Sequence, residues 1–359
     1  MTSPTELSER TAPAPPRPPA PRGPLSAAVV DLLAVDPGTV DAATIDALAS
    51  TADAAIAASS DPVGDDDLQL ALFCSYLVHY GPLEWSGGDW EWVPELIAVR
   101  RKLELAFEAA LRAQVPMPDR IPTTAPEMAA LLFDLTNADD GPSLSKWFSR
   151  NATPELLREF LIQRSIYTLR EADPHSWGIP RLRGRTKVAL VEIQSDEYGG
   201  GRPEHMHATI YAGTMAALGL DTRLDHYLDE ASTATLASMN TMSLFGLNRR
   251  LRGAIAGHLA AFEMTSSIPN RLYGDAFRRN GFGPEVTWYY DEHVEADAVH
   301  EQIAAHDLAG SLAEDEPELA ADVVFGAAAC LYVDGLMAQH MYDAWTEGRS
   351  AAYTGKRDA

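Results

Sequence analysis

The sequence is poor in cysteine, poor in basic residues and free of long uninterrupted apolar runs. Its two cysteines, Cys74 and Cys330, lie far apart in apolar surroundings. We expect both thiols to be buried hydrophobic side chains in a reducing cytoplasm, rather than a disulfide or metal ligands. The longest apolar runs, such as 323–333, are shorter than the ~20 residues that span a bilayer, and no secretory signal opens the chain. The sequence therefore predicts a soluble, cytoplasmic protein with no membrane partner.

Basic residues are outnumbered by 52 acidic side chains to 28, which gives a formal net charge of −24 at pH 7. This charge repels polyanions, and no basic stripe with interleaved aromatic residues interrupts it, so we expect no nucleic-acid partner. It would attract a cationic substrate, although acidic surfaces often serve only solubility. Nucleotide-binding signatures are missing as well, because residues 199–201 lack the Lys and Ser/Thr of a P-loop and no Rossmann fingerprint is present.

The sequence lacks a convincing alternation of apolar and polar residues, which is the pattern of a half-buried β-strand. Most of the chain shows helical periodicity instead, which predicts an all-α protein. Residues 1–25 are rich in proline and predict a disordered tail. Residues 26–118 predict an N-terminal helical region suited to dimerisation, and residues 119–359 predict the main helical domain. In this domain Thr153 and Pro154 form a strong helix start. The later helices are expected at about 183–198, 204–218, 232–244, 247–268, 285–305 and 316–346.

The segment 289–300 carries the most informative pattern. His293, Asp297 and His300 occupy positions i, i+4 and i+7 of a predicted helix, so they lie on one face over two turns. Two imidazoles and one carboxylate suit iron and leave coordination positions open. The alternative is a solvated helix face with two surface histidines.

Two further segments add acidic and histidine side chains. Glu263 lies within the apolar run 256–264, where an ionised carboxylate needs a cation, either a metal ion or an arginine. Glu197 and His207 flank Gly199–Gly201, where the chain must kink to bring His207 back, and His205 competes with His207 as a ligand. Carboxylates and histidines that project inward from several bundle helices are typical of di-iron carboxylate proteins.

These spacings over residues 150–346 resemble the haem-oxygenase-like di-iron oxidases and oxygenases, or iron-containing redox enzymes. The resemblance implies a haem-oxygenase-like helical bundle. In that family one helix supplies a Glu and then a His, the next a Glu, and a third a His-x3-Asp-x2-His set. The six matching residues here are Glu197, His207, Glu263, His293, Asp297 and His300. The gap between Glu197 and His207 is longer than the Glu-x6-His of the fatty-acid-decarboxylating members.

The long gap is similar to that of the N-oxygenating members, which use an additional Glu as an iron ligand. Glu171 lies where that residue is expected, although it could also be a surface charge at a helix end. The resemblance thus implies two Fe(II)/Fe(III) ions with Glu171, Glu197 and Glu263 as catalytic ligands, O2 as co-substrate, and natural-product biosynthesis. It also implies a homodimer and an external electron donor, either a reductase or a small reductant.

The first functional hypothesis is therefore an N-oxygenase that acts on an amine or guanidine nitrogen of a small amino-acid-like substrate, through a peroxo-di-iron(III) intermediate. The second keeps the metal site for desaturation, decarboxylation or C–C fragmentation of a small amino or fatty acid. The third is a metal-free haem-oxygenase-like protein or an iron-storage bundle.

Candidate substrate residues follow from helical geometry. Arg252 lies on nearly the same helical face as Glu263, ~16 Å along the axis, and either binds a substrate carboxylate or forms a structural ion pair. Tyr289 and Tyr290 precede His293 by about one turn and either line the pocket or serve packing.

Overall fold

The computed structural model describes residues 17–138 and 143–355, and of residues 295–298 only the backbone. Within these ranges the chain is helical and contains no β-strand, so the predicted all-α class is confirmed. The first half of the helices comprises α1 (Pro24–Leu33), α2 (Ala42–Ala58), α3 (Asp66–Leu77), α4 (Pro94–Gln114), α5 (Ala125–Asn137), α6 (Leu144–Asn151), α7 (Pro154–Thr168) and α8 (Asp173–Ser176). The second half comprises α9 (Gly184–Glu197), α10 (His207–Ala217), α11 (Thr233–Leu247), α12 (Arg252–Met264), α13 (Ser267–Arg279), α14 (Pro284–Gln302), α15 (Ser311–Asp315) and α16 (Ala320–Thr346).

Short helical turns connect many of these helices. The 3₁₀ turns are η1 (Pro37–Thr39), η2 (Ile179–Arg181), η3 (Gly199–Gly201), η4 (Pro203–His205), η5 (Leu228–Glu230), η6 (Arg249–Leu251) and η8 (Pro317–Leu319). The segment η7 (Ile303–Gly310) is a π-helix that follows α14 directly. A π-helical segment widens the helix and frequently accompanies a functional site.

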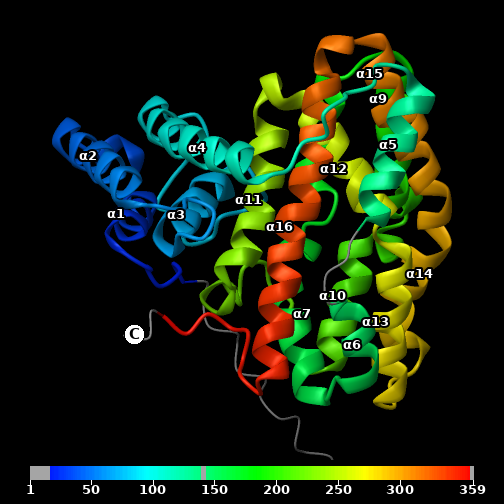
Figure 1. The fold of residues 1–359 in the computed structure, drawn as a ribbon. Helices are drawn as coiled ribbons and strands as arrows, with labels where there is room; N and C mark the ends of the chain where they lie inside the picture. Colours follow the sequence, from blue (N-terminus) through cyan, green and yellow to red (C-terminus); the bar gives the residue numbers. More distant parts are fainter. Residues whose placement is uncertain (1–16, 139–142, 356–359) are drawn as a thin grey trace, which may run out of the picture.

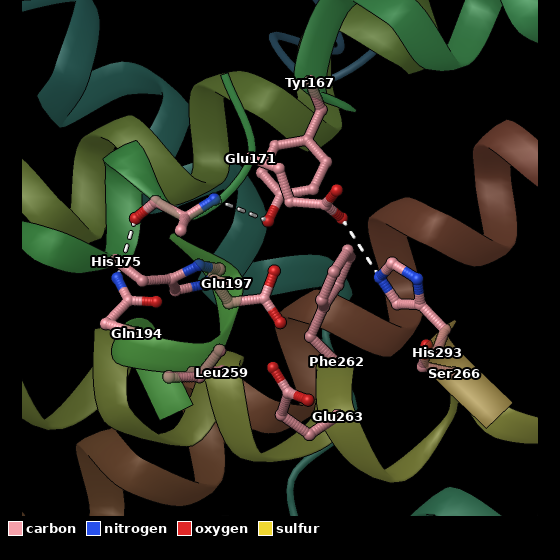
Figure 2. A pocket seen from close by; sticks show the side chains of 11 residues that line it. Tyr167, Glu171, His175, Gln194, Glu197, Leu259, Phe262, Glu263, Ser266 and His293 are labelled. Atoms are coloured by element: carbon pink, nitrogen blue, oxygen red, sulfur yellow. Dashed lines mark hydrogen bonds and ion pairs between the residues drawn. The ribbon is translucent and has the colours of Figure 1, made fainter. Parts of the chain in front are cut away.

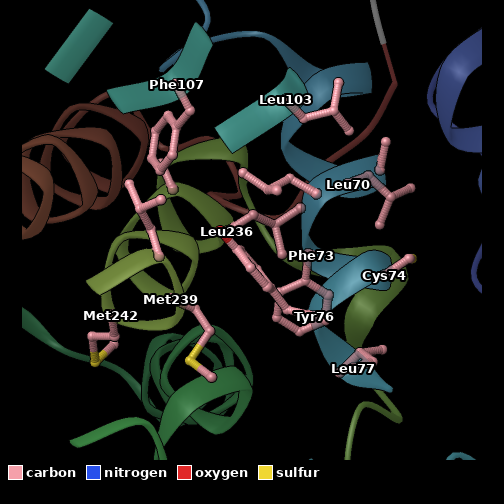
Figure 3. Packing of buried hydrophobic residues seen from close by; sticks show 14 of the residues in the cluster. Leu70, Phe73, Cys74, Tyr76, Leu77, Leu103, Phe107, Leu236, Met239 and Met242 are labelled. Atoms are coloured by element: carbon pink, nitrogen blue, oxygen red, sulfur yellow. The ribbon is translucent and has the colours of Figure 1, made fainter. Parts of the chain in front are cut away.

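Helices α1–α4 form a group on one side of α11, and the larger bundle lies on its other side (Figure 1). The side chains of α3 and α11 share one hydrophobic core, in which Phe73 and Tyr76 lie beside Leu236 and Met239 (Figure 3). This core continues into α16 through Phe325. The N-terminal helical region therefore packs on the main domain through a continuous apolar contact.

The described part of the predicted tail is not free of contacts. Residues 1–16 lie outside the described residues, but the Ala20 amide donates a hydrogen bond to Asp229 at 2.7 Å, and Arg22 donates to the Ala231 carbonyl at 2.6 Å. Leu25 is fully buried as the second residue of α1. The prediction of a tail up to residue 25 thus extended too far, because prolines before a helix also serve as its start.

Helices α12 and α16 approach each other closely at Gly257 and Gly326. A Cβ atom at either glycine would overlap a backbone carbonyl of the opposite helix, that of Val323 or Ala254. The contact fixes α12, which carries Glu263, against the long central helix. The segment Pro317–Thr346 is long and apolar enough to span a bilayer, but 61% of its most apolar window is buried within the fold. Its position is that of a core helix in a soluble protein.

The sequence signals for the helices that surround the site are largely confirmed. Thr153 caps α7 by accepting a hydrogen bond from the Leu156 amide, with Pro154 at the first helical position. The predicted helix over 247–268 is interrupted, because η6 precedes α12 and a turn at residues 265–266 separates α12 from α13. Around the site, α14 contacts both α10 and α12, and α10 contacts α7.

Candidate metal centre

Glu197 and His207 are brought together by a glycine turn. Glu197 is the last residue of α9, and Gly199, Gly200 and Gly201 all have positive φ angles, of 75°, 58° and 81°. A side chain at Gly199 would also press on the Met206 amide. The chain therefore reverses, and His207 begins α10 with its Nδ1 atom 2.8 Å from Oε2 of Glu197. The predicted kink is the feature that builds this contact.

His207, and not His205, is the histidine that enters the site. His207 is 2% exposed and lies against His293, with ring centroids 4.4 Å apart. The ring of His205 instead packs edge-on against Trp288 at 5.4 Å. The alternative that the sequence left open is thus resolved by the direction of the η4 turn.

Two groups of buried acidic and histidine side chains meet at Glu197. Within each group, ligand atoms lie within 4.8 Å of one another. The first ligand group consists of Glu171, Glu197, His207 and His293. The second ligand group consists of Glu197, Glu263 and His300. Glu197 is therefore the carboxylate that could contribute to a metal position in either group.

The atoms of these groups point toward common positions rather than toward each other. Oε2 of Glu197 and Nδ1 of His207 lie 2.8 Å apart as an ion pair, and among the described residues neither atom has a partner of good hydrogen-bond geometry. Nδ1 of His300 also lacks a hydrogen bond, although Oε2 of Glu263 lies at 3.3 Å. Buried polar atoms without partners cost free energy, which a bound cation would offset. The donor set of carboxylates and imidazoles fits iron.

The outer atoms of the two α14 histidines are held by hydrogen bonds that fix their orientation. Nδ1 of His293 donates to the Tyr289 carbonyl at 2.7 Å, so its Nε2 is the nitrogen that faces Glu171, at 3.7 Å. Nε2 of His300 lies 3.0 Å from Asp196, which leaves Nδ1 facing Glu263. Metal-binding histidines almost always use their second nitrogen in this way.

Glu171 is held in the site by Tyr289 and by a strained turn. The Tyr289 hydroxyl lies 2.8 and 2.9 Å from the two carboxylate oxygens of Glu171 and donates to them. Ala172, the next residue, has a positive φ of 74°, which is uncommon for a residue other than glycine. Its amide lies 3.4 Å from the Tyr167 hydroxyl, and its carbonyl accepts from Gln194 at 2.8 Å. Glu171 is 5% exposed, so it is not a surface charge at a helix end.

In the metal-free chain, the charges of the two ligand groups favour a positive charge among them. Burial alone would raise the pKa of Glu197, but His207, His293 and His300 lower it well below its usual range. Burial alone would lower the pKa of His300, but the carboxylates of Glu263, Asp196 and Glu197 raise it to about 9. At pH 7 a proton on His300 therefore compensates the carboxylates, and a metal ion would displace it.

The comparisons with known proteins agree with this chemistry. The family model described as an iron-containing redox enzyme matches residues 158–335, which include every proposed ligand. The chain belongs to the family of iron-containing redox enzymes. It is therefore an oxidoreductase, and its family confirms the predicted haem-oxygenase-like helical bundle.

Individual relatives are more distant. The chain is 27% identical to the nitrosourea synthase of Streptomyces achromogenes subsp. streptozoticus over 158 residues, or 44% of this chain. The match spans only 33% of that relative's length. A cadd-like protein of unknown function from Nostoc punctiforme shares the fold with a TM-score of 0.50 and 18% identity, over 61% of this chain and 97% of that one. A domain of unknown function with a heme oxygenase-like fold, from Shewanella denitrificans, has a TM-score of 0.46 and 15% identity, over 64% of this chain and 96% of that one.

A small cavity adjoins both ligand groups of this family member. Glu171, Glu197 and Glu263 point into it, and His293 reaches it from α14 (Figure 2). The apolar part of its wall comes from Leu259, Phe262 and Tyr167. The cavity therefore combines buried carboxylates and imidazoles with a smaller apolar wall, and electrostatic interactions are strong in such a buried place.

The three candidate substrate residues, Arg252, Tyr289 and Tyr290, do not line the cavity. Arg252 does not line it and instead pairs with Glu316 at 2.5 Å, because the start of α12 turns its side chain toward the segment before η8. Tyr290 packs on Phe277 with ring centroids 5.0 Å apart. Tyr289 acts through Glu171 rather than as a lining residue. Asp297 lies outside the described side chains.

A second buried histidine pair lies beside the cavity and was assigned no role from the sequence. Nε2 of His175 lies 3.1 Å from Nδ1 of His258, and their remaining nitrogens have no hydrogen-bond partner. Burial lowers the pKa of His175 to about 4, against an opposing effect of Glu197, and burial and His175 lower that of His258 further. Both imidazoles are therefore neutral at pH 7. Asp196 is the other residue that the sequence analysis missed, although it directly precedes Glu197 in the sequence.

Proposed function

We propose that this protein is a non-haem di-iron oxygenase that transfers oxygen to an amine or guanidine nitrogen of a small amino-acid-like substrate. The observation that carries the proposal is the pair of buried ligand groups that share Glu197. One group alone would support a mononuclear site. Two groups joined by one carboxylate support a pair of ions, and the iron-containing family supports iron as the metal.

Nitrogen as the site of oxidation is supported by Glu171 and by one relative. Glu171 is buried among the members of the first ligand group, where it adds a third carboxylate to the centre. This extra carboxylate is the feature that the N-oxygenating members of the family are expected to share. The nitrosourea synthase is named for a nitrogen product, but the match covers a third of that protein, so its activity comes to this chain only as a proposal.

Each residue around the centre has a distinct part in the proposed reaction. Bound ferrous ions would supply electrons and open coordination positions for dioxygen. Tyr289 holds Glu171 through its hydroxyl, and Asp196 orients the His300 ring. Leu259 and Phe262 supply an apolar part of the cavity wall, which would limit the access of water to the substrate nitrogen.

Further parts of the proposal concern partners. An external reductant, either a reductase or a small molecule, would return the irons to the ferrous state after each cycle. The N-terminal helical region would form a homodimer, and its surface includes Trp92, which is 69% exposed. We place the protein in the cytoplasm, where a reducing environment keeps Cys74 and Cys330 as free thiols.

The test is anaerobic reconstitution with ferrous iron, an iron count, and stopped-flow absorption after mixing with oxygen. Candidate amines and guanidines are then screened for faster decay of the absorbing species, and products of ¹⁵N-labelled substrates are analysed by NMR and mass spectrometry. We expect iron in excess of one ion per chain and a new N–O bond. Less than one ion per chain would favour a metal-free or storage protein, and oxygen on carbon, or a broken C–C bond, would favour the desaturase or decarboxylase alternative.

Glu171→Ala separates the nitrogen proposal from the alternatives, with the exposed Glu204→Ala as the matched control. We expect Glu171→Ala to lose N-oxygenation and Glu204→Ala to retain it. A Glu171→Ala protein that binds iron normally and keeps full activity would contradict the proposed role of the additional carboxylate.

A further inference from the structure

Arg170, which directly precedes the proposed ligand Glu171, is a buried charge with no part in the centre described above. It is 3% exposed, although arginine is rarely buried without a specific partner. It lies in the turn that follows α7, where its amide donates to the Tyr167 carbonyl at 2.8 Å and the Glu171 amide donates to the Thr168 carbonyl at 3.3 Å. Glu171 lines the cavity and Arg170 does not, so the two side chains of this turn have different surroundings.

The turn that carries both residues is strained and needs support from its surroundings. Ala172 has a φ angle of 74°, and a residue other than glycine keeps such a conformation only where neighbouring contacts enforce it. One such contact comes from Gln194 of α9, which donates to the Ala172 carbonyl at 2.8 Å. The side chain of Arg170 supplies further contacts, to two other segments of the chain.

The Arg170 guanidinium is held by one ion pair and two aromatic rings. Its Nη2 atom donates to Oδ2 of Asp225 at 2.5 Å. Its Cζ atom lies over the ring of Phe73, 5.6 Å from the centroid, and over that of Tyr80 at 6.0 Å, distances at which an aromatic face attracts a cation. Phe73 is 1% exposed, and the Tyr80 hydroxyl lies 3.1 Å from that of Ser243 on α11. The guanidinium therefore has a defined position, which anchors the backbone that bears it.

These contacts connect the N-terminal helical region with the metal centre. Phe73 belongs to α3 and Tyr80 to the segment that follows it, whereas Asp225 lies between α10 and η5. A region that served dimerisation alone would need only an outward surface, but Phe73 and Tyr80 are buried against Arg170. The N-terminal region therefore has a structural connection to the turn of Glu171 that dimerisation does not explain.

We propose that Arg170 is a positioning residue for the proposed iron ligand Glu171. Through Phe73 and Tyr80, the N-terminal region is then part of the support of the metal centre. The inference rests on the proposed function, since it concerns the same centre. Arg170 fixes the backbone of the strained turn, while Tyr289 fixes the carboxylate of Glu171 through its hydroxyl. A ligand held at both ends loses less conformational freedom when the ion binds, which strengthens binding.

The test is the rate at which a ferrous chelator removes each iron from the anaerobically reconstituted full chain. His207→Ala and His300→Ala, each of which lacks a ligand of one group only, assign the two phases of release. In Arg170→Gln we expect the iron of the first ligand group to leave ~10- to 100-fold faster, as when an outer partner of a metal ligand is lost. The iron of the second ligand group should leave at a rate within about twofold of the wild type.

Arg112→Gln is the matched control. Arg112 also lies over an aromatic ring, that of Phe325 at 4.1 Å, and it pairs with Asp322 at 3.1 Å. It joins α4 of the N-terminal region to α16 rather than to the turn of Glu171, so its loss should leave both rates unchanged. Arg170→Lys keeps the charge without the planar group and should have an intermediate effect, which provides the test if Arg170→Gln does not fold.

The contribution of the N-terminal region is tested with two core variants. Phe73→Leu removes one ring face from Arg170 and should accelerate release of the first iron ~2- to 5-fold, which corresponds to one cation–π contact. Phe107→Leu removes a fully buried ring of the same apolar core on α4 and should leave that rate unchanged, although it lowers stability. Urea unfolding of both variants measures how far stability falls and separates this fall from the local effect.

Equal acceleration of both phases in Arg170→Gln, or unaltered rates in the Arg170 and Phe73 variants, would overturn the proposal. An equal effect of Arg112→Gln or Phe107→Leu would also overturn it, since Arg170 would then act only through global stability. A wild-type chain that holds a single iron would contradict the di-iron function, yet faster release of that iron from Arg170→Gln would still support the role of Arg170. A wild-type chain that binds no iron would overturn both.

Discussion

The two ligand groups of the metal centre differ in how they are enclosed. The first group has four buried members, and its Glu171 and His293 are both held by Tyr289, which is itself buried. The second group has three described members, and its His300 is held by Asp196, whose side chain is 59% exposed. One ion would thus be held by an interior network, and the other by a network that reaches the surface.

The two candidate metal positions therefore need not be equivalent, although each takes one histidine from the same helix. His293 and His300 lie seven residues apart on the same face of α14, ~10.5 Å along its axis, so each serves a different group. Because the Asp196 carboxylate is exposed, water and protons compete with His300 for its hydrogen bond. We therefore expect the ion in the second group to exchange more readily than the ion in the first.

The largest effect is expected at Glu197, because its carboxylate belongs to both groups. Glu197→Ala should weaken the binding of both irons by more than ~100-fold, since the loss of even an outer partner costs ~10- to 100-fold. The measurement is the iron content after reconstitution and desalting, together with oxygen consumption. Glu192→Ala is the control, because Glu192 is an exposed carboxylate on the same helix. Retention of one iron in Glu197→Ala would show that the two positions do not share this ligand.

A smaller and selective effect is expected when one histidine is removed from each group. His300→Ala should abolish only the second position, and His207→Ala should weaken the first while Glu263 and His300 remain in place. Mössbauer spectra of ⁵⁷Fe-loaded protein distinguish the two sites and show which signal disappears. If either variant loses both signals equally, the positions depend on each other and the comparison between them fails.

The local parts of this site were predictable, since they follow from helical periodicity and from polar residues in apolar segments. The stripe of His293 and His300 and the burial of Glu263 needed only the sequence around them. The three consecutive glycines indicated the kink that brings a histidine back to Glu197. Whether that histidine is His207 or His205 depended on the exact reversal of the chain at η4. That reversal is a three-dimensional property that residue spacing does not contain.

The residues that were missed or misassigned depend on contacts between distant segments. Arg252 lies on the helix of Glu263, yet its partner Glu316 is 64 residues away in the sequence. Arg170 shows no special pattern in the sequence, because an arginine near the end of a helix is normally a surface residue. Only the packing of the N-terminal region on the main domain reveals that it is buried.

A moderate effect should follow from replacing the outer hydrogen-bond partner of each group. Asp196→Asn should weaken the second iron by ~10- to 100-fold, while Tyr289→Phe should affect the first group through Glu171. The rates at which a ferrous chelator removes each iron give the measurement. Asp196→Asn should accelerate only the faster of the two phases. Acceleration of the slower phase by this variant would reverse the assignment of the more exposed position.

The remaining effect concerns stability rather than iron binding, at the histidine pair beside the centre, where burial outweighs the opposing charge of Glu197 on His175. The folded-state pKa of His175, about 4, is below the ordinary 6.5, so the unfolded chain binds more protons as the pH falls between these values. The free energy of unfolding of the metal-free protein should therefore decrease from about pH 6.5 toward pH 4. His175 should contribute on the order of 3 kcal/mol to this decrease. Urea unfolding of wild type and His175→Gln over this range measures the difference. The variant should show a shallower decrease, whereas His226→Gln, at a more exposed site, should follow the wild type. Parallel curves for wild type and His175→Gln would mean that His175 is protonated in the folded protein, as His300 of the metal centre is without its ion.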